Sequence, residues 1–96
     1  MSAFVILDLS IHDAVEMKAY QELAPATIAA YEGKIIVRSE QAISMEGDWS
    51  PNRIVIIEFA TMERAKEWYN SEMYQAASVY RNKAAVTKMI FVEGVK

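Results

Sequence analysis

Apolar residues recur along this chain in two patterns, one typical of strands and one typical of helices. Runs rich in β-branched residues predict four strands, at residues 3–9, 34–39, 53–59 and 87–93. Apolar residues three or four positions apart predict a helix over residues 13–32 and a second helical region over residues 61–82. The members of these helical stripes are Met17, Tyr20, Ala24, Ile28 and Tyr31, then Ala65, Trp68, Tyr69, Met73, Ala76, Ala77 and Tyr80.

The order of these elements, βαββαβ, predicts the architecture. Two right-handed crossovers around a central hairpin produce the ferredoxin-like α+β fold, a four-stranded antiparallel sheet with both helices on one face. We expect a single domain over residues 1–96. The strands are apolar on both faces, so the face without helices needs a cover of its own. A second copy packing sheet against sheet would supply it, which predicts a homodimer through the open sheet face, that is, a dimeric α/β barrel.

Local signals predict where the elements begin and end. Thr61 and Ser71 are expected N-caps, the second restarting the helix. Pro25 predicts a kink or break near Leu23 and Ala24, and Gly33 is expected to supply the left-handed residue that ends the first helix. After residues 34–39 the strand is expected to resume over residues 42–46, before a turn at residues 47–51.

Composition narrows the functional classes. Apolar residues make up 53% of the 96 positions, charged residues 24%, and the net charge is −3. An acidic chain without a basic run is poorly suited to nucleic acid. The absence of cysteine fits a reducing compartment, no leader pattern is visible, and no run approaches the ~20 apolar residues that span a bilayer. We therefore expect a cytoplasmic protein that uses neither nucleic acid nor membrane as a partner.

Three charged residues in apolar strands are the first candidates for chemistry. Asp8, Arg38 and Glu58 each interrupt an otherwise apolar run, and a buried charge is costly unless it is paired. Arg38 and Glu58 belong to hairpin strands and are expected to lie close together. One interpretation is a structural ion pair. The other is a polar floor in a pocket between sheet and helices, where Arg38 holds an anionic or carbonyl group and Glu58 or Asp8 acts as catalytic base.

Aromatic residues form the second set of candidates. The aromatic residues of the helical stripes either fill the core or line a flat ligand, with phenolic hydroxyls as polar contacts. They are Trp68, Tyr69, Tyr74 and Tyr80, with Tyr20 and Tyr31. Trp49 stands in a turn, where it either caps a pocket or packs on a partner subunit. Arg81 either neutralises a carboxylate or complements a helix C-terminus. His12, the only histidine, is expected to serve at the entry of a helix, and no metal set, phosphate loop or bound cofactor is expected.

The sequence also resembles a known family. The resemblance rests on short sequence runs and a few single residues. They are LAP at residues 23–25 with Tyr31, IVR at 36–38, EGDW at 46–49 with Pro51, IEF at 57–59, WYNS at 68–71 with Tyr74, Arg81, and VEGV at 92–95. In this order and spacing they resemble the bacterial family called domain of unknown function 1330, within the dimeric α/β-barrel superfamily. The resemblance implies the ferredoxin-like fold and a dimer. It implies no reaction, since superfamily relatives range from cofactor-independent oxygenases and isomerases to haem-handling and assembly domains.

Three functions stay open at this stage, and whether the protein is an enzyme is undecided. The leading hypothesis is a dimeric domain that binds a small organic ligand, with Arg38, Glu58, Trp68, Tyr74, Arg81 and Trp49 as ligand-binding residues. The first alternative is a cofactor-independent enzyme of the monooxygenase or isomerase kind, with Glu58 or Asp8 performing acid–base chemistry. The second is a purely structural dimerisation domain without a ligand.

Overall fold

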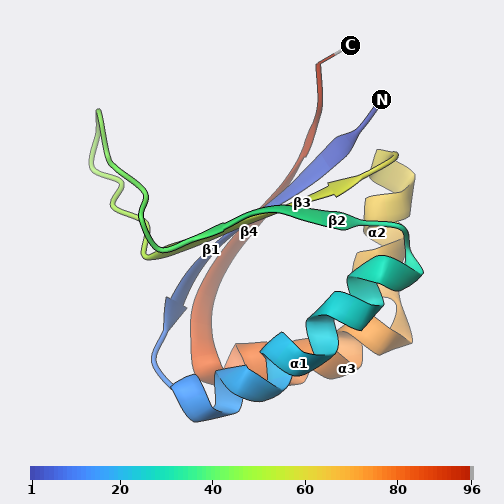
Figure 1. Cartoon of the computed structure of the whole chain (residues 1–96), viewed down its shortest axis with the longest axis horizontal. Coiled ribbons are helices and arrows are strands. Elements are labelled where there is room, and N and C mark those ends of the chain that lie inside the picture. The colour runs from blue at the N-terminus through green and yellow to red at the C-terminus, as the bar shows by residue number, and fades with distance from the viewer. Residues whose placement is uncertain (96) are drawn as a thin grey trace.

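A computed structural model describes residues 1–95 and contains the predicted order of elements (Figure 1). The elements within those residues are β1 (Ala3–Ile11), α1 (Ala14–Ala30), β2 (Lys34–Ser39), β3 (Arg53–Phe59), α2 (Met62–Asn70), α3 (Glu72–Ala84) and β4 (Ala85–Glu93). The strands form one antiparallel sheet in the order β2-β3-β1-β4, with the helices on one face. The ferredoxin-like prediction is confirmed. In this part of the chain no helix combines the length and hydropathy of a membrane crossing.

Helix α1 is continuous across its proline. Asp13 caps its first turn by accepting a hydrogen bond from the Glu16 amide at 3.0 Å. The helix continues through Pro25, so the expected break is wrong, although the proline still removes one backbone donor. Its last carbonyls accept hydrogen bonds from the amides of Glu32 and Gly33, the arrangement of a Schellman motif.

The residue that reverses the chain after α1 is Glu32 and not Gly33. Glu32 has a φ of 59°, whereas Gly33 lies outside the left-handed region, so the expectation for Gly33 is wrong. Glycine is needed at position 33 for a different reason. A Cβ there would stand 2.5 Å from Cε1 of Phe59, because the turn crosses directly over that ring.

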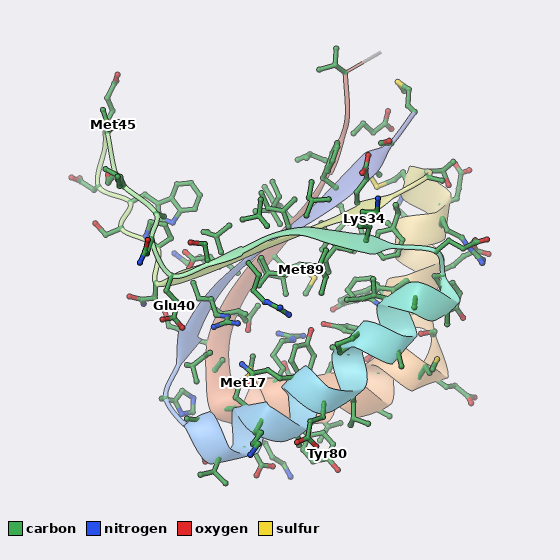
Figure 2. All side chains as sticks on the ribbon, viewed as in Figure 1. Met17, Lys34, Glu40, Met45, Tyr80 and Met89 are labelled. Atoms are coloured by element: carbon green, nitrogen blue, oxygen red, sulfur yellow. The ribbon has the colours of Figure 1, made fainter. Side chains whose placement is uncertain are left out.

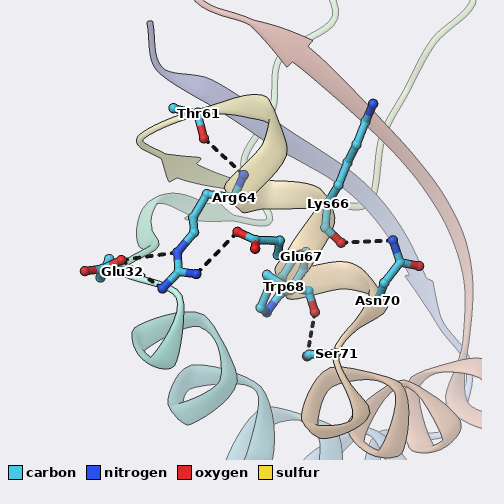
Figure 3. A network of polar contacts seen from close by, with 8 residues as sticks. All are labelled: Glu32, Thr61, Arg64, Lys66, Glu67, Trp68, Asn70 and Ser71. Carbon is cyan, nitrogen blue, oxygen red and sulfur yellow. Dashed lines mark hydrogen bonds and ion pairs between the residues drawn. The ribbon is translucent and has the colours of Figure 1, made fainter.

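The caps of the other two helices are as predicted. The hydroxyl of Thr61 accepts from the Arg64 amide at 3.0 Å, and that of Ser71 accepts from the Tyr74 amide at 3.1 Å. Figure 3 shows that Arg64 of α2 also contacts Glu32 in the turn after α1. Arg64 donates to the Glu32 carboxylate from Nη2 at 3.0 Å, and its guanidinium lies 4.8 Å from the centroid of the Tyr31 ring.

The core fills the space between the helices and the inner face of the sheet, the face that the helices cover. Alternate residues of β1, namely Ala3, Val5, Leu7 and Leu9, are buried there. The stripe predicted for α1 is confirmed, but the one predicted for α3 is partly wrong. Met73, Ala76 and Tyr80 are exposed, and Figure 2 shows Tyr80 pointing away from the sheet. The buried residues of α3 are Tyr74, Ala77, Ser78, Arg81 and Ala84.

Between β2 and β3 the chain forms an arm, residues 40–52, that extends past the sheet on the side away from the helices (Figure 1). The strand expected over residues 42–46 is wrong, because that segment has no strand structure. The hydroxyl of Ser39 accepts a hydrogen bond from the Gln41 amide at 3.0 Å, a local turn that ends β2. The arm presents apolar side chains to solvent, with Ile43 82% and Met45 85% exposed, and Figure 2 shows Met45 at its tip.

Candidate ligand-binding cleft

An irregularity in β2 decides where its arginine points. Ile35 pairs with Ile57, but Val37 pairs with Ile56, so β2 carries one extra residue between these two pairs. Such a bulge shifts every later residue of the strand to the opposite face. Arg38 therefore lies opposite Val55 and shares the inner face of the sheet, although simple alternation from Ile35 would place it on the outer face.

Arg38 lines a cleft of about 420 Å³ between α1 and the sheet, which we call the α1 cleft. Its walls combine apolar residues of four elements with a few polar groups. They are Leu7 and Leu9 of β1, Met17, Tyr20, Gln21, Ala24, Pro25 and Ile28 of α1, Ile35 and Arg38 of β2, and Arg53, Val55 and Ile57 of β3. A mostly apolar cleft with a few convergent polar groups is the usual form of a site for a small organic molecule.

The charges that line this cleft are all positive. Arg38 and Arg53 come from the sheet wall, and the lining includes no aspartate or glutamate. Arg53 forms an ion pair with Glu40 at the base of the arm, with Nη1 2.9 Å from Oε1, but the Glu40 side chain is 69% exposed. Within residues 1–95, Arg38 takes part in no salt bridge. Arg38 is exposed, so solvent screens part of its charge, and Glu40 offsets part of the charge of Arg53. Because no acidic residue lines the cleft, it still favours an anion over a cation.

Tyr20, which lines the cleft from α1, belongs to a second group of polar residues together with Tyr74 and Arg81 of α3. The hydroxyls of Tyr20 and Tyr74 are 2.9 Å apart and hydrogen-bonded. The guanidinium carbon of Arg81 lies 6.0 Å from the centroid of the Tyr20 ring. Arg81 is only 6% exposed, and its Nε has no hydrogen-bond partner among the described residues. Burial, and then the neighbouring Tyr74, raises the pKa of the Tyr20 hydroxyl above its ordinary value, whereas Arg81 acts in the opposite direction.

Glu58 and Asp8 lie on the outer face of the sheet, the face without helices. In the register of the sheet, Glu58 stands opposite Lys34, and the bulge leaves Arg38 on the other face. The expected proximity of Arg38 and Glu58 is therefore wrong. Asp8 accepts a hydrogen bond from Nε1 of Trp49 at 2.9 Å, and its Oδ1 is buried without a partner among residues 1–95. Neither carboxylate reaches the α1 cleft, where the sequence had led us to expect a base.

The aromatic candidates divide between core and surface. Trp68 and Tyr74 are fully buried, with ring centroids 4.1 Å apart, and the indole Nε1 of Trp68 donates to Oγ1 of Thr27 at 3.0 Å. Neither lines the cleft, so their role here is that of core residues. Trp49 is 56% exposed and bonded to Asp8 beside the arm.

Two polar residues of the cleft, Gln21 and Arg53, are missing from the sequence-based candidates. Arg53 occupies the same alternate positions of its strand as Val55, Ile57 and Phe59, which mark the inner face, and that alternation is a signal that could have found it. Tyr20 was among the helical aromatic residues for which the sequence left a core role and contact with a ligand both open. His12 is exposed just before α1, as expected, and residues 1–95 hold no group of three or more histidine, cysteine, aspartate or glutamate side chains placed for a metal.

Comparison with protein families finds one match. The model of the family described as "Domain of unknown function (DUF1330)" matches residues 2–95. A search of curated proteins finds no match.

Solved structures share the fold at low sequence identity. A protein of unknown function from Rhodopseudomonas palustris has a TM-score of 0.78 and 16% identity, covering 99% of this chain and 83% of its own. SnoaB, a cofactor-independent oxygenase from Streptomyces nogalater, has a TM-score of 0.72 and 9% identity, covering 99% and 94%. A dimeric ferredoxin-like protein of unknown function from Bacteroides fragilis has a TM-score of 0.64 and 16% identity, covering 97% and 96%. These likenesses establish the fold alone.

Proposed function

The chain belongs to the DUF1330 family, whose description assigns no reaction, and we therefore propose a function from its own geometry: it binds a small organic anion in the α1 cleft. The observation that carries the proposal is that all the charged residues lining the cleft are positive. Arg38 and Arg53 line it, and no lining residue is acidic. Arginine is the residue best suited to hold a carboxylate, because its planar guanidinium matches both oxygens.

The rest of the cleft restricts what kind of anion would fit. Between the arginines and α1 the lining is aliphatic, contributed by residues such as Leu7, Met17 and Ile57. A carboxylate on a compact apolar or aromatic body would bury its hydrocarbon against these side chains while its charge meets Arg38. A highly hydrated inorganic anion would leave the aliphatic walls unused. The proposed ligand class is therefore a small organic acid.

The first test compares an acid with its neutral isostere. We expect benzoate to bind about tenfold or more tightly than benzamide, because a hydrogen bond to a charged group contributes about 1.5–3 kcal/mol. In the Arg38→Met variant this preference should largely disappear. Lys66→Met is the matched control, since Lys66 is exposed on α2 and does not line the cleft. Calorimetric titration measures both affinities, and equal binding of the two ligands by the native protein would contradict the proposal.

The assembly that we propose is a homodimer through the outer face. That face carries an apolar surface with Ile90 56% and Val92 37% exposed, and the arm extends beyond it with further exposed apolar side chains. The solved structures of the same fold include proteins described as dimeric, from Bacteroides fragilis and from Jannaschia. A second copy is the occupant that matches both observations, since each arm would then lie against the other copy.

An enzymatic function is the second candidate, and the fold is what favours it, since it is shared with a cofactor-independent oxygenase. With Asp8 and Glu58 on the outer face, acid–base chemistry in the α1 cleft would have to use Tyr20 or a group of the ligand itself. Incubating the protein with an acid that it binds, in air, and analysing the products by mass spectrometry separates turnover from binding. If no ligand binds and the α1 cleft is filled by the protein's own side chains, a purely structural dimerisation domain would be favoured instead.

The cytoplasmic location expected from the cysteine-free sequence stays part of the proposal. Fractionation of host cells is its test.

A further inference from the structure

The hydrogen-bonded hydroxyls of Tyr20 and Tyr74 point to a more specific ligand. Tyr20 and Tyr74 share one hydrogen bond of 2.9 Å, so one hydroxyl hydrogen is used between them and the other is left over. Tyr74 is fully buried and does not line the cleft, whereas Tyr20 does. If Tyr20 were the donor, the hydrogen of Tyr74 would be buried without an acceptor, which is unfavourable. The favoured arrangement has Tyr74 donating to Tyr20 and Tyr20 donating toward the cleft.

The charge beside this pair indicates what Tyr20 should meet. Arg81 is 6% exposed, its Nε lacks a partner, and it forms no salt bridge within residues 1–95. The last turn of α3, where it lies, compensates a buried cation only in part. An uncompensated positive charge next to the Tyr20 ring favours an electron-rich oxygen at its hydroxyl. A tyrosine hydroxyl is protonated at neutral pH, and burial raises the pKa of Tyr20 further, so this hydroxyl keeps a hydrogen to donate.

We propose that the α1 cleft selects carboxylates that carry a second oxygen, a keto or hydroxyl oxygen, which accepts a hydrogen bond from Tyr20. This inference rests on the proposed function, in which Arg38 and Arg53 hold the carboxylate. All three residues line the cleft, the arginines from β2 and β3 of the sheet and Tyr20 from α1, so a ligand held by the arginines could meet Tyr20 with a second oxygen. The rest of the lining is largely aliphatic. The ligand class is therefore an oxo- or hydroxy-carboxylic acid with an apolar middle.

The test uses ligands that differ in one atom position. The probes are 3- and 4-acetylbenzoate and the corresponding isopropenylbenzoates, in which a CH₂ group replaces the ketone oxygen at nearly the same shape. For at least one position of substitution, we expect the acetyl compound to bind about three- to tenfold more tightly, the range typical of a neutral hydrogen bond. Calorimetric titration of the purified full chain measures the four dissociation constants.

Two conservative variants assign the effect to Tyr20. Tyr20→Phe should remove the preference for the acetyl compounds while keeping the preference for benzoate over benzamide. Tyr74→Phe leaves Tyr20 free to donate and should keep both preferences, which separates a hydrogen bond from a general disturbance of the aromatic cluster. Unfolding curves of both variants check that they are folded.

The possible failures are distinguishable. If benzoate and benzamide bind equally, the proposed function is contradicted and this inference with it. If the preference for benzoate is present but the native protein does not distinguish acetyl from isopropenyl, only the inference about the second oxygen is overturned. A preference for acetyl that survives in Tyr20→Phe would overturn it as well.

Discussion

Both faces of the sheet carry many apolar residues, but they differ in how their charges are arranged. On the outer face, acidic and basic residues stand directly opposite each other on neighbouring strands, Asp8 opposite Lys88 and Glu58 opposite Lys34. On the inner face, the charged residues at the cleft are Arg38 and Arg53, with Arg81 of α3 nearby. Cross-strand pairs of opposite sign stabilise a sheet modestly and leave little net field. The outer face is therefore suited to a protein partner, and the inner face to an anion.

The faces also differ in what covers them. Helices of the same chain bury the inner face, and every inward residue of β1 from Ala3 to Leu9 is at most 2% exposed. The outer residues of β1 are only half-buried, and Ile90 on the neighbouring β4 is more exposed than buried. A small domain can bury one face of its sheet with two crossover helices, but the other face depends on association. This difference teaches that stability and assembly should respond to separate sets of mutations.

The two largest expected effects are of similar size, and the first concerns assembly through the outer face. Ile90→Lys would place an unpaired charge within the proposed contact between copies, at a cost of about 3 kcal/mol or more, or about a hundredfold in the dimer Kd. Val79→Lys is the control, because Val79 is similarly exposed, at 48%, but lies on α3. Light scattering at micromolar protein should give twice the chain mass for the native protein and the control. A native monomer, or an Ile90→Lys dimer of unchanged affinity, would contradict the proposed interface.

The second effect concerns packing under the inner face. Trp68 is fully buried and contacts the rings of Phe59 and Tyr74, so Trp68→Ala should lower the free energy of unfolding by about 3–5 kcal/mol. Tyr80→Ala removes an aromatic ring from the exposed side of α3 and should cost about 0.5 kcal/mol. Urea unfolding of both variants at one protein concentration measures the difference. A loss below about 1 kcal/mol for Trp68→Ala would show that the aromatic cluster is not structural.

The contrast between the faces explains how far the sequence alone could lead. The four β-branched runs and N-caps such as Thr61 and Ser71 are local signals, and the predictions made from them are confirmed. Residues 42–46 lack such a run, and the strand predicted there is wrong. The prediction of which side of α3 faces the core was partly wrong, because this helix carries apolar residues on two sides. Tyr80 therefore fits a helical stripe as well as Tyr74 does. Only contact with the sheet distinguishes the two.

The site was harder to predict because it depends on one extra residue in β2. Strict alternation assigns Arg38 to the outer face and toward Glu58, and no local pattern in residues 34–39 marks the bulge that reverses it. The inward direction of Arg53 could have been predicted, because Arg53 alternates in its strand with Val55 and Ile57 and so shares their face. The lack of a salt bridge to Arg81 within residues 1–95 could not be predicted, because it depends on which carboxylates lie near it in the folded chain.

The smallest expected effect tests the separation of the faces directly. Since Arg38 and Glu58 point to opposite sides of the sheet, their contributions to stability should be independent. A double-mutant cycle of Arg38→Met and Glu58→Gln should give a coupling energy below about 0.3–0.5 kcal/mol, the limit within which distant sites add. The cycle of Lys34→Met and Glu58→Gln should instead give about 0.2–1 kcal/mol, because these residues are cross-strand neighbours of opposite charge. Urea unfolding at fixed protein concentration supplies both values. A coupling above about 1 kcal/mol between Arg38 and Glu58 would mean that β2 lacks the bulge and that Arg38 belongs to the outer face after all.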